Sequence, residues 1–411
     1  MLDLVIVGGG PAGISTALHV LAADPRVRLA VLEKERYPRE KICAGAVGGR
    51  AFRLLERLGV EVDCPRVRLD AIAMRVGGQT VVVPEPGCGA VVRRIEFDHA
   101  FAQVAQARGV DVRDGCEVSR ITVGDGGVEL ETAGGTLRAR AVIGADGVGG
   151  VVRRQAGFPR GELRAQVAEL DTEDVPGDLP RDTAVFDFAA TDLRGYAWDF
   201  PTQVGGRALV CRGVYLLRTP AAAAQAAAAQ AQEAAAQTQE AASAPAPAPG
   251  VRDRIAAYLG ARGLELSRYR LKQFAERGFE PGAEIAKPRV LLVGEAAGID
   301  IATGEGIGQA IEYGAVAGPY LARALARDDL GFADWRRAVE RHHLGWQLGI
   351  RHGCYRAFYG RRRPKIERLM PRMPSLFRLA VQDFAGVPLS KLAMVRGAAQ
   401  FLAAFTRAKL A

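Results

Sequence analysis

The chain has 411 residues, of which 49% are hydrophobic and 25% charged, with 55 Lys and Arg against 46 Asp and Glu. This balance excludes a disordered or collagen-like chain and is enough for a large core shared by two or three substructures. The six cysteines show no CxxC pair and no metal-ligand spacing, and no stretch of about 20 apolar residues is present to cross a bilayer. We therefore expect a cytoplasmic protein without a metal site.

The N-terminal region predicts a strand, a helix and a second strand of a parallel sheet. Residues 2–7 are a short apolar run ended by glycines, residues 11–25 have apolar side chains at helical spacing, and residues 28–35 predict the next strand. Two parallel strands need such a crossover helix between them.

The turn between the first strand and the helix carries a G-x-G-x-x-G pattern, formed by Gly8, Gly10 and Gly13. These glycines allow a tight turn, the approach of backbone to a pyrophosphate, and close packing of helix on strand. Glu33 ends the second strand, where an acid binds ribose hydroxyls. The unit therefore predicts a dinucleotide site, and its flanking positions are further candidates for cofactor contact: Pro11, Ala12 and Lys34.

The chain then leaves this sheet and returns to it twice. A hairpin is predicted around residues 71–84, followed by a helix from about residue 95 and a meander that ends in a buried strand before Asp146 and Gly147. The second return is the string VLLVGEAAG, in which Gly294 and Glu295 again follow a strand. A ligand contacted at three separated strand ends is extended, which indicates FAD with its adenosine at the first loop.

The remaining segments predict a second sheet and a helical tail. Residues 161–218 alternate like strands and are rich in aromatic residues, residues 220–250 are an Ala/Gln/Pro insertion without core-forming side chains, and the chain is mostly helical from about residue 334. The expected fold is α/β, with a Rossmann-like FAD-binding domain, an inserted antiparallel-sheet substrate domain and a C-terminal helical region. Its boundaries are FAD-binding segments 1–70, 98–160 and 286–330, substrate-domain segments 71–97 and 161–285, and a basic helical region 331–411.

These motifs resemble the FAD-dependent oxidoreductases of the para-hydroxybenzoate hydroxylase-like superfamily, and the loop GEAAG…ATGEGIG is most similar to the geranylgeranyl reductases within it. The resemblance implies that the backbone of Gly304 and Gly306 lies against the flavin ring, with Ile307 beside it, and that Glu295 binds the ribityl chain. The family usually has aspartate at that position.

Two further stretches resemble the same reductases. In REKICAGAVGG, the resemblance implies FAD contacts from Arg39, Lys41, Ala44 and Gly45, and Cys43 is either a proton donor near the flavin or a small buried hydrophobe. Arg94 is another candidate FAD contact. In GYAWDFP, alternation places Tyr196, Trp198 and Phe200 on one face of a strand, where they either pack between sheets or line the substrate pocket.

The resemblance implies an enzyme that reduces C=C bonds of a prenyl or similarly apolar substrate, with electrons from NAD(P)H, a flavin reductase or ferredoxin. A flavin monooxygenase or halogenase is the alternative, and a flavoprotein without turnover is a third hypothesis. The tail from Arg351 to Ala411 has thirteen Lys and Arg against two Asp and Glu, interleaved with Phe377, Leu379, Phe401, Leu402 and Phe405. This pattern favours an anionic membrane surface as partner over nucleic acid.

Overall fold

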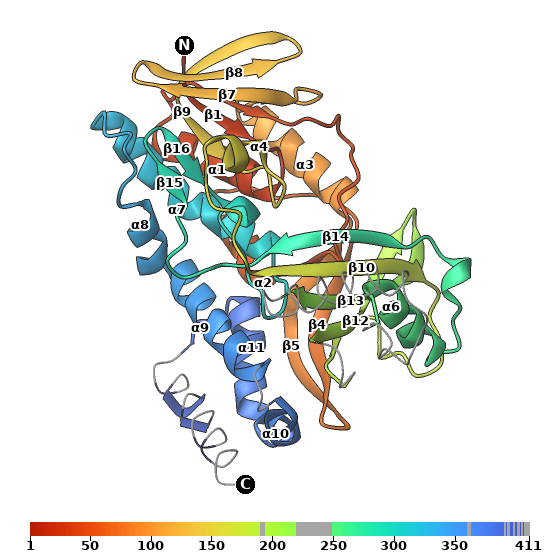
Figure 1. Ribbon diagram of the computed structural model, residues 1–411. Coiled ribbons are helices and arrows are strands. Elements are labelled where there is room, and N and C mark those ends of the chain that lie inside the picture. Colours follow the sequence, from red (N-terminus) through yellow and green to blue (C-terminus); the bar gives the residue numbers. More distant parts are fainter. Residues whose placement is uncertain are drawn as a thin grey trace, which may run out of the picture.

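The structure is a computed structural model that describes residues 1–189, 194–218, 249–359 and 363–389, together with residues 392, 395–397, 399, 400, 403 and 406. The predicted Ala/Gln/Pro insertion lies outside the described residues as far as residue 248. The described chain forms two sheets, with helices on and between them (Figure 1).

The first sheet is the predicted parallel sheet, because apolar strands buried on both faces alternate with helices along the chain. Its strand order is β15-β16-β9-β1-β2-β6, and β7 and β8 extend it through β9 as a meander. Strands β1, β2, β6, β9 and β16 pair in parallel. The bounds of its strands are β1 Leu2–Val7, β2 Leu29–Leu32, β6 Asp111–Arg113, β7 Val118–Gly124, β8 Gly127–Thr132, β9 Gly135–Gly144, β15 Ala286–Lys287 and β16 Val290–Leu292.

Helices α1 (Pro11–Ala23) and α7 (Ile307–Ala326) pack closely against each other beside this sheet. Two glycines of α7 make that approach feasible: a Cβ on Gly314 would lie 2.3 Å from Ser15 Oγ, and one on Gly318 would lie 2.4 Å from His19 Cβ. The first glycine loop leads into α1, and the loop before Ile307 leads into α7. The packing of the two helices therefore brings together these two loops, which are the first and last parts of the predicted cofactor site.

The second sheet has the order β14-β10-β13-β12-β11-β4-β5-β3. Most neighbours are antiparallel as predicted, but β11 pairs with β4 in parallel, because the chain reaches β11 by a long crossover and not by a hairpin. The hairpin of β4 and β5 begins before the predicted boundary at residue 71. The bounds of its strands are β3 Ala46–Gly48, β4 Arg66–Val76, β5 Gln79–Val92, β10 Arg164–Thr172, β11 Thr183–Asp187, β12 Gly195–Val204, β13 Arg207–Arg218 and β14 Lys272–Arg277.

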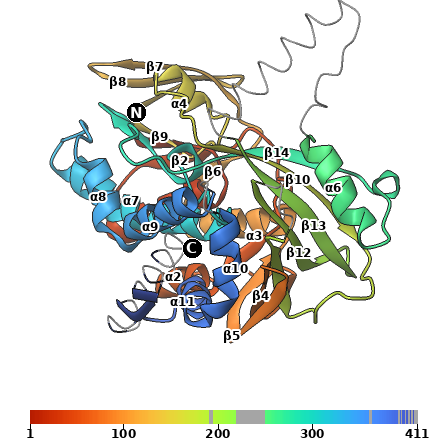
Figure 2. The same cartoon turned by 60° about the horizontal axis from the view of Figure 1, so that its bottom comes forward.

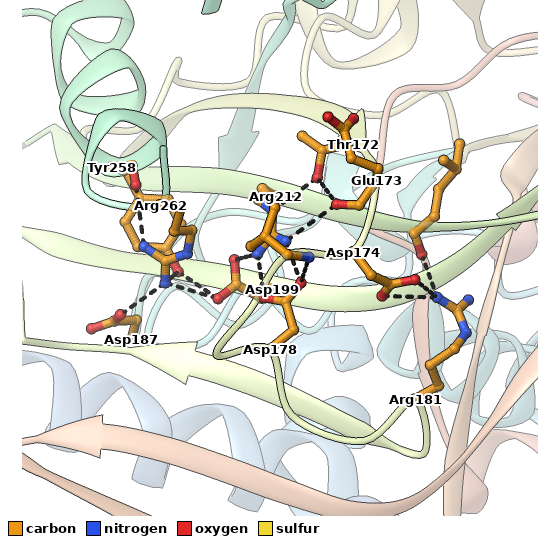
Figure 3. Close-up of polar contacts among 12 residues, drawn as sticks. Thr172, Glu173, Asp174, Asp178, Arg181, Asp187, Asp199, Arg212, Tyr258 and Arg262 are labelled. Atoms are coloured by element: carbon orange, nitrogen blue, oxygen red, sulfur yellow. Dashed lines mark hydrogen bonds and ion pairs between the residues drawn. The ribbon is translucent and has the colours of Figure 1, made fainter. Parts of the chain in front are cut away.

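One face of the second sheet carries buried charges next to helix α6 (Val251–Gly260). Arg212 lies between Asp178 and Asp199 at 2.5 and 2.7 Å, and Arg262 lies 2.9 Å from Asp199 (Figure 3). Each of these charges meets an opposite one, which limits the cost of removing it from water. Asp199 belongs to β12 and Arg212 to β13. Because successive side chains of a strand point to opposite faces of the sheet, the residues next to them in sequence lie on the other face.

The C-terminal helices cover that other face, as α11 (Pro374–Ala385) lies beside β5 in both ribbon views (Figures 1 and 2). Phe377 and Val381 of α11 are 5% and 3% exposed and belong to the same apolar cluster as Tyr196 and Trp198. The other α-helices that the structure describes are α2 Gly49–Arg57, α3 Arg94–Ala107, α4 Val151–Gln155, α8 Trp335–Arg341, α9 His343–Phe358 and α10 Arg363–Leu369.

The prediction that Phe377 faces a membrane is wrong, because this side chain fills the core between α11 and the second sheet. Leu379 is half-buried, and Phe401, Leu402 and Phe405 lie outside the described residues. Among the helices that the structure describes, none is long and apolar enough to cross a bilayer.

Candidate functional site

The first glycine loop joins β1 to α1 in a conformation that only glycine suits. Gly8 has φ +108°, and a Cβ there would lie 2.4 Å from the carbonyl oxygen of Ala145; a Cβ on Gly13 would lie 1.9 Å from the carbonyl oxygen of Gly8. Gly10 is different, because the nearest atoms to a Cβ are guanidinium nitrogens of Arg94 and Arg39 at 3.6 and 3.9 Å. The loop thus leaves open space between a helix N-terminus and two arginines, which suits a pyrophosphate.

Those two arginines are fixed by buried acids. Arg39 contacts Glu33 Oε2 at 3.1 Å and Asp98 Oδ2 at 2.9 Å, and Arg94 binds both oxygens of Asp98 at 2.6 and 2.7 Å. The backbone N–H of Gly9 donates to Glu33 Oε2 at 3.0 Å. Glu33 is therefore held at the loop, where an acid meets ribose hydroxyls, and both guanidinium groups stay aimed at the phosphate position.

The second strand end places Asp146 and Gly147 beside the third motif. Asp146 Oδ2 accepts the N–H of Val152 at 2.9 Å, whereas Oδ1 has no hydrogen-bond partner among the described residues. Burial raises the pKa of Asp146 to about 6. A Cβ on Gly147 would lie 3.4 Å from Glu295 Oε2, so a side chain here would press on the third motif's acid.

The third strand end, after β16, also places a glycine and an acid side by side. Gly294 has φ +60°, and a Cβ there would lie 2.5 Å from the Cβ of Ala12 in the first loop, so the two motifs touch. Glu295 Oε1 is buried and has no hydrogen-bond partner among the described residues. Burial raises the pKa of Glu295, and the charge of the exposed Lys41 partly offsets this rise. A buried acceptor without a partner fits a ligand hydroxyl such as one on a ribityl chain.

The loop between Gly298 and Ile307 separates this region from the second sheet. Gly304 has φ +68°, and a Cβ there would lie 2.9 Å from the hydroxyl oxygen of Tyr196 and 3.0 Å from Cε2 of Tyr215. Gly306 is the N-cap of α7, so Ile307 begins the helix whose positive dipole end points at the loop. The loop therefore lies between a helix N-terminus and the aromatic face of the second sheet.

A network of buried charges holds this loop. Asp300 accepts the N–H groups of Ala302 and Thr303 at 2.7 and 3.2 Å, and Arg351 of α9 contacts Asp300 and Glu305 at 2.7 Å each. The network continues to α2 and α11 through three further ion-paired residues: Arg50, Glu312 and Asp383. The loop is thus tied to the helical tail, a connection that no sequence motif indicated.

The segment with Cys43 lies over the second sheet. The N–H of Cys43 donates to Glu169 Oε1 at 3.2 Å, and Cys43 Sγ accepts the N–H of Gly45 at 3.4 Å. Burial raises the pKa of the Cys43 thiol, so the sulfur keeps its proton. Ala44 is half-buried, whereas Lys34 is exposed and its ammonium is 3.6 Å from Glu35, so its predicted cofactor contact has no support from the loop geometry.

The predicted aromatic face exists: Tyr196, Trp198 and Phe200 are 4%, 3% and 4% exposed. Tyr196 stacks on Tyr215 of β13 with ring centroids 5.0 Å apart, and Gly213 leaves the space that the Trp198 ring fills, since a Cβ there would lie 2.1 Å from Cζ2. Among the residues that the structure describes, no group of three His, Cys, Asp or Glu could hold a metal ion.

The residues 1–327 match a family model described as an FAD binding domain. Digeranylgeranylglycerophospholipid reductase 1 of Methanococcoides burtonii is 26% identical over 359 residues, which cover 84% of this chain and 79% of that protein. A geranylgeranyl bacteriochlorophyll reductase-like protein from Thermoplasma acidophilum has the same fold, with a TM-score of 0.63 and 17% identity over 96% of this chain and 95% of that chain. The flavin-dependent brominase Bmp2 has a TM-score of 0.70 and 18% identity over 98% of each chain.

The family match agrees with the geometry, because the open space at Gly10, the two fixed guanidinium groups and the unpaired oxygen of Glu295 are what a bound FAD needs. FAD is the cofactor, as predicted, and the similarity to geranylgeranyl reductases seen in the motifs fits these relatives. The chain belongs to the family of proteins with this FAD-binding domain and is an FAD-dependent oxidoreductase.

Proposed function

We propose that this protein reduces a C=C bond of a prenyl or similarly apolar substrate. Bound FAD, once reduced by an external donor such as NAD(P)H, a flavin reductase or ferredoxin, supplies the hydride. The observation that carries the proposal is the group of aromatic rings on one face of β12 and β13. Asp199 and Arg212 lie in the ion cluster beside α6 (Figure 3), whereas the buried rings of Tyr196, Trp198 and Tyr215 lie on the opposite face, next to Gly304.

An apolar, aromatic surface beside the redox-active end of the cofactor suits an isoprenoid chain, because burying its methylene and methyl groups there contributes about 25 cal/mol per Å² of apolar area. The relative named as a lipid reductase supports the same substrate class. The proposed roles of the loop residues follow: Gly304 and Gly306 keep side chains away from the ring, and Glu295 accepts a ribityl hydroxyl.

Cys43 is a candidate proton source in this proposal, because burial keeps its thiol protonated. Its N–H is held by Glu169, a residue of the same sheet face as the aromatics. We expect Cys43→Ala to retain FAD and to slow substrate reduction; unchanged reduction would assign Cys43 to packing alone.

A halogenase or monooxygenase is the second candidate, favoured by the shared fold of the brominase. Anaerobic reoxidation separates the two. Photoreduced enzyme is mixed with a geranylgeranyl lipid or, as control, with its fully saturated counterpart. The proposal predicts reoxidation by the unsaturated lipid alone. No reoxidation by any prenyl lipid without oxygen would contradict it.

The exposed arginines of the tail support a further part of the proposal, which is collection of the lipid at an anionic membrane. Arg356, Arg368, Arg372 and Arg378 are exposed on α9, α10 and α11 and at the turn between the last two. Each basic residue near such a surface contributes about 1 kcal/mol, which salt screens. Co-sedimentation with phosphatidylserine vesicles should therefore fall as salt rises, and binding that is equal on neutral phosphatidylcholine vesicles would contradict it.

A further inference from the structure

A second carboxyl group lies at the junction of the Gly304 loop and the second sheet. Glu276 belongs to the edge strand β14, where it pairs with Ala165 of β10. Its oxygen Oε2 would lie 3.4 Å from a Cβ on Gly304, beside the hydroxyl of Tyr196 and the ring of Tyr215 that border the same position. Glu276 is thus on the side of the sheet that faces the predicted flavin loop.

This carboxyl group has a polar neighbour on the sheet. Glu276 Oε2 and the Tyr215 hydroxyl are buried side by side and interact as a hydrogen-bonding pair, and neither atom has another hydrogen-bond partner among the described residues. Burial raises the pKa of Glu276 well above its ordinary value, the nearby charge of Glu295 raises it further, and the hydrogen bond with Tyr215 partly offsets this rise. Burial and the charge of Glu295 thus favour the protonated, neutral form of this carboxyl group.

The other acidic groups on this side differ from Glu276 in position or in contacts. Glu169 Oε1 accepts the N–H of Cys43, and its Oε2 has no hydrogen-bond partner among the described residues, but the acid nearest to a Cβ on Gly304 is Glu276. Asp300 caps the loop and pairs with Arg351 at 2.7 Å. Glu295 faces Gly147 in the second cofactor motif. Glu276 is the acid whose oxygen lies next to both Gly304 and the aromatic face.

We propose that Glu276, in place of the candidate Cys43, is the acid that protonates the substrate carbon in the reduction, an inference that rests on the proposed reductase function. The π bond of the alkene would be replaced by two C–H bonds: bound, reduced FAD would supply a hydride, with its two electrons, to one carbon, and the Glu276 carboxyl group would give its proton to the other. The Glu276 carboxylate would then regain a proton from water. Enzymes keep a catalytic carboxylic acid protonated by placing it in an apolar site, which raises its pKa.

The test compares Glu276→Gln with Glu284→Gln in the FAD-loaded protein. Glu284 is exposed and pairs with Lys287 at 3.6 Å, so its substitution is a matched change of acid to amide on the same segment. Infrared spectra should show a protonated-carboxyl C=O band that shifts in D₂O and is lost in Glu276→Gln but kept in Glu284→Gln. In anaerobic mixing with a geranylgeranyl lipid, Glu276→Gln should be reoxidised about 10²- to 10⁴-fold more slowly, with its flavin spectrum unchanged.

Absence of that band, or reoxidation of Glu276→Gln at the wild-type rate, would overturn the assignment. If the amide variant loses FAD, Glu276→Asp replaces it: it keeps the acid on a shorter side chain, so its C=O band should move and its reoxidation should be slower than that of the wild type. A wild-type protein that no prenyl lipid reoxidises would overturn the reductase function itself, whereas a defect confined to the Glu276 variants supports both.

Discussion

Arg351 offers a direct test of the charge network that ties the helical tail to the Gly304 loop. Its guanidinium contacts Asp300 and Glu305 at 2.7 Å each and Asp383 at 3.5 Å, and the side chains of the three acids are 0%, 5% and 14% exposed. Arg351→Gln leaves the fully buried Asp300 without its cation, while Glu305 and Asp383 keep Arg50 as partner at 3.3 and 3.0 Å. Breaking a buried ion pair from one side costs about 3–5 kcal/mol, since the remaining charge stays out of water.

We therefore expect urea unfolding of the FAD-loaded protein to show a loss of about 3–5 kcal/mol in Arg351→Gln, together with weaker retention of FAD, because Asp300 caps the loop that we propose to lie against the flavin. Arg356→Gln is the control, since Arg356 is exposed on the same helix, and it should change stability by less than about 0.5 kcal/mol. A loss below about 1 kcal/mol in Arg351→Gln is the range of exposed ion pairs and would refute the reasoning.

Three other predictions concern the loop, the tail and pH. Gly13→Val should give colourless protein, because a Cβ there would lie 1.9 Å from the Gly8 oxygen; a normal flavin spectrum would contradict this. Phe377→Ala should lower the free energy of unfolding by about 3–5 kcal/mol, and a negligible loss would show that α11 lies outside the core. The pKa of His343 is raised from 6.5 to about 9 by Asp383 and Glu312, so its protonation stabilises the fold fully below pH 6.5 and ceases to do so as the pH passes about 9. Because His343 is 42% exposed, we expect the free energy of unfolding to fall by only about 1 kcal/mol as the pH rises from 6.5 to about 9. If His343→Asn shows the same pH-dependent fall, the assignment to His343 is contradicted.

The cofactor motifs were predictable from sequence because each lies within a few residues of a strand end. Gly8 and Gly13 are required by one local turn, and the step from strand to helix is visible in the apolar pattern. The alternation of Tyr196, Trp198 and Phe200 likewise needs only the period of a strand.

The rest of the site depends on which strands and helices become neighbours, and sequence patterns do not carry that information. Glu276 reaches Gly304 only through the pairing of β14 with β10, and Arg351 reaches Asp300 only through the packing of α9 on the loop. Because sequence patterns do not show which elements become neighbours, the prediction that the helical tail lies on a membrane missed its packing on the rest of the protein. Its positive charge predicted a solvated or membrane-bound surface, yet Arg351 is ion-paired inside and Phe377 is buried.

Product mass with and without oxygen tests the central claim most directly. The FAD-loaded protein is incubated with its electron donor and a geranylgeranyl lipid, once in air and once anaerobically, and the lipid is analysed by mass spectrometry. The proposed reductase predicts a product two hydrogens heavier under both conditions. A product that gains an oxygen or a halogen, and that forms only in air, would contradict the reductase function and leave the FAD-binding fold in place.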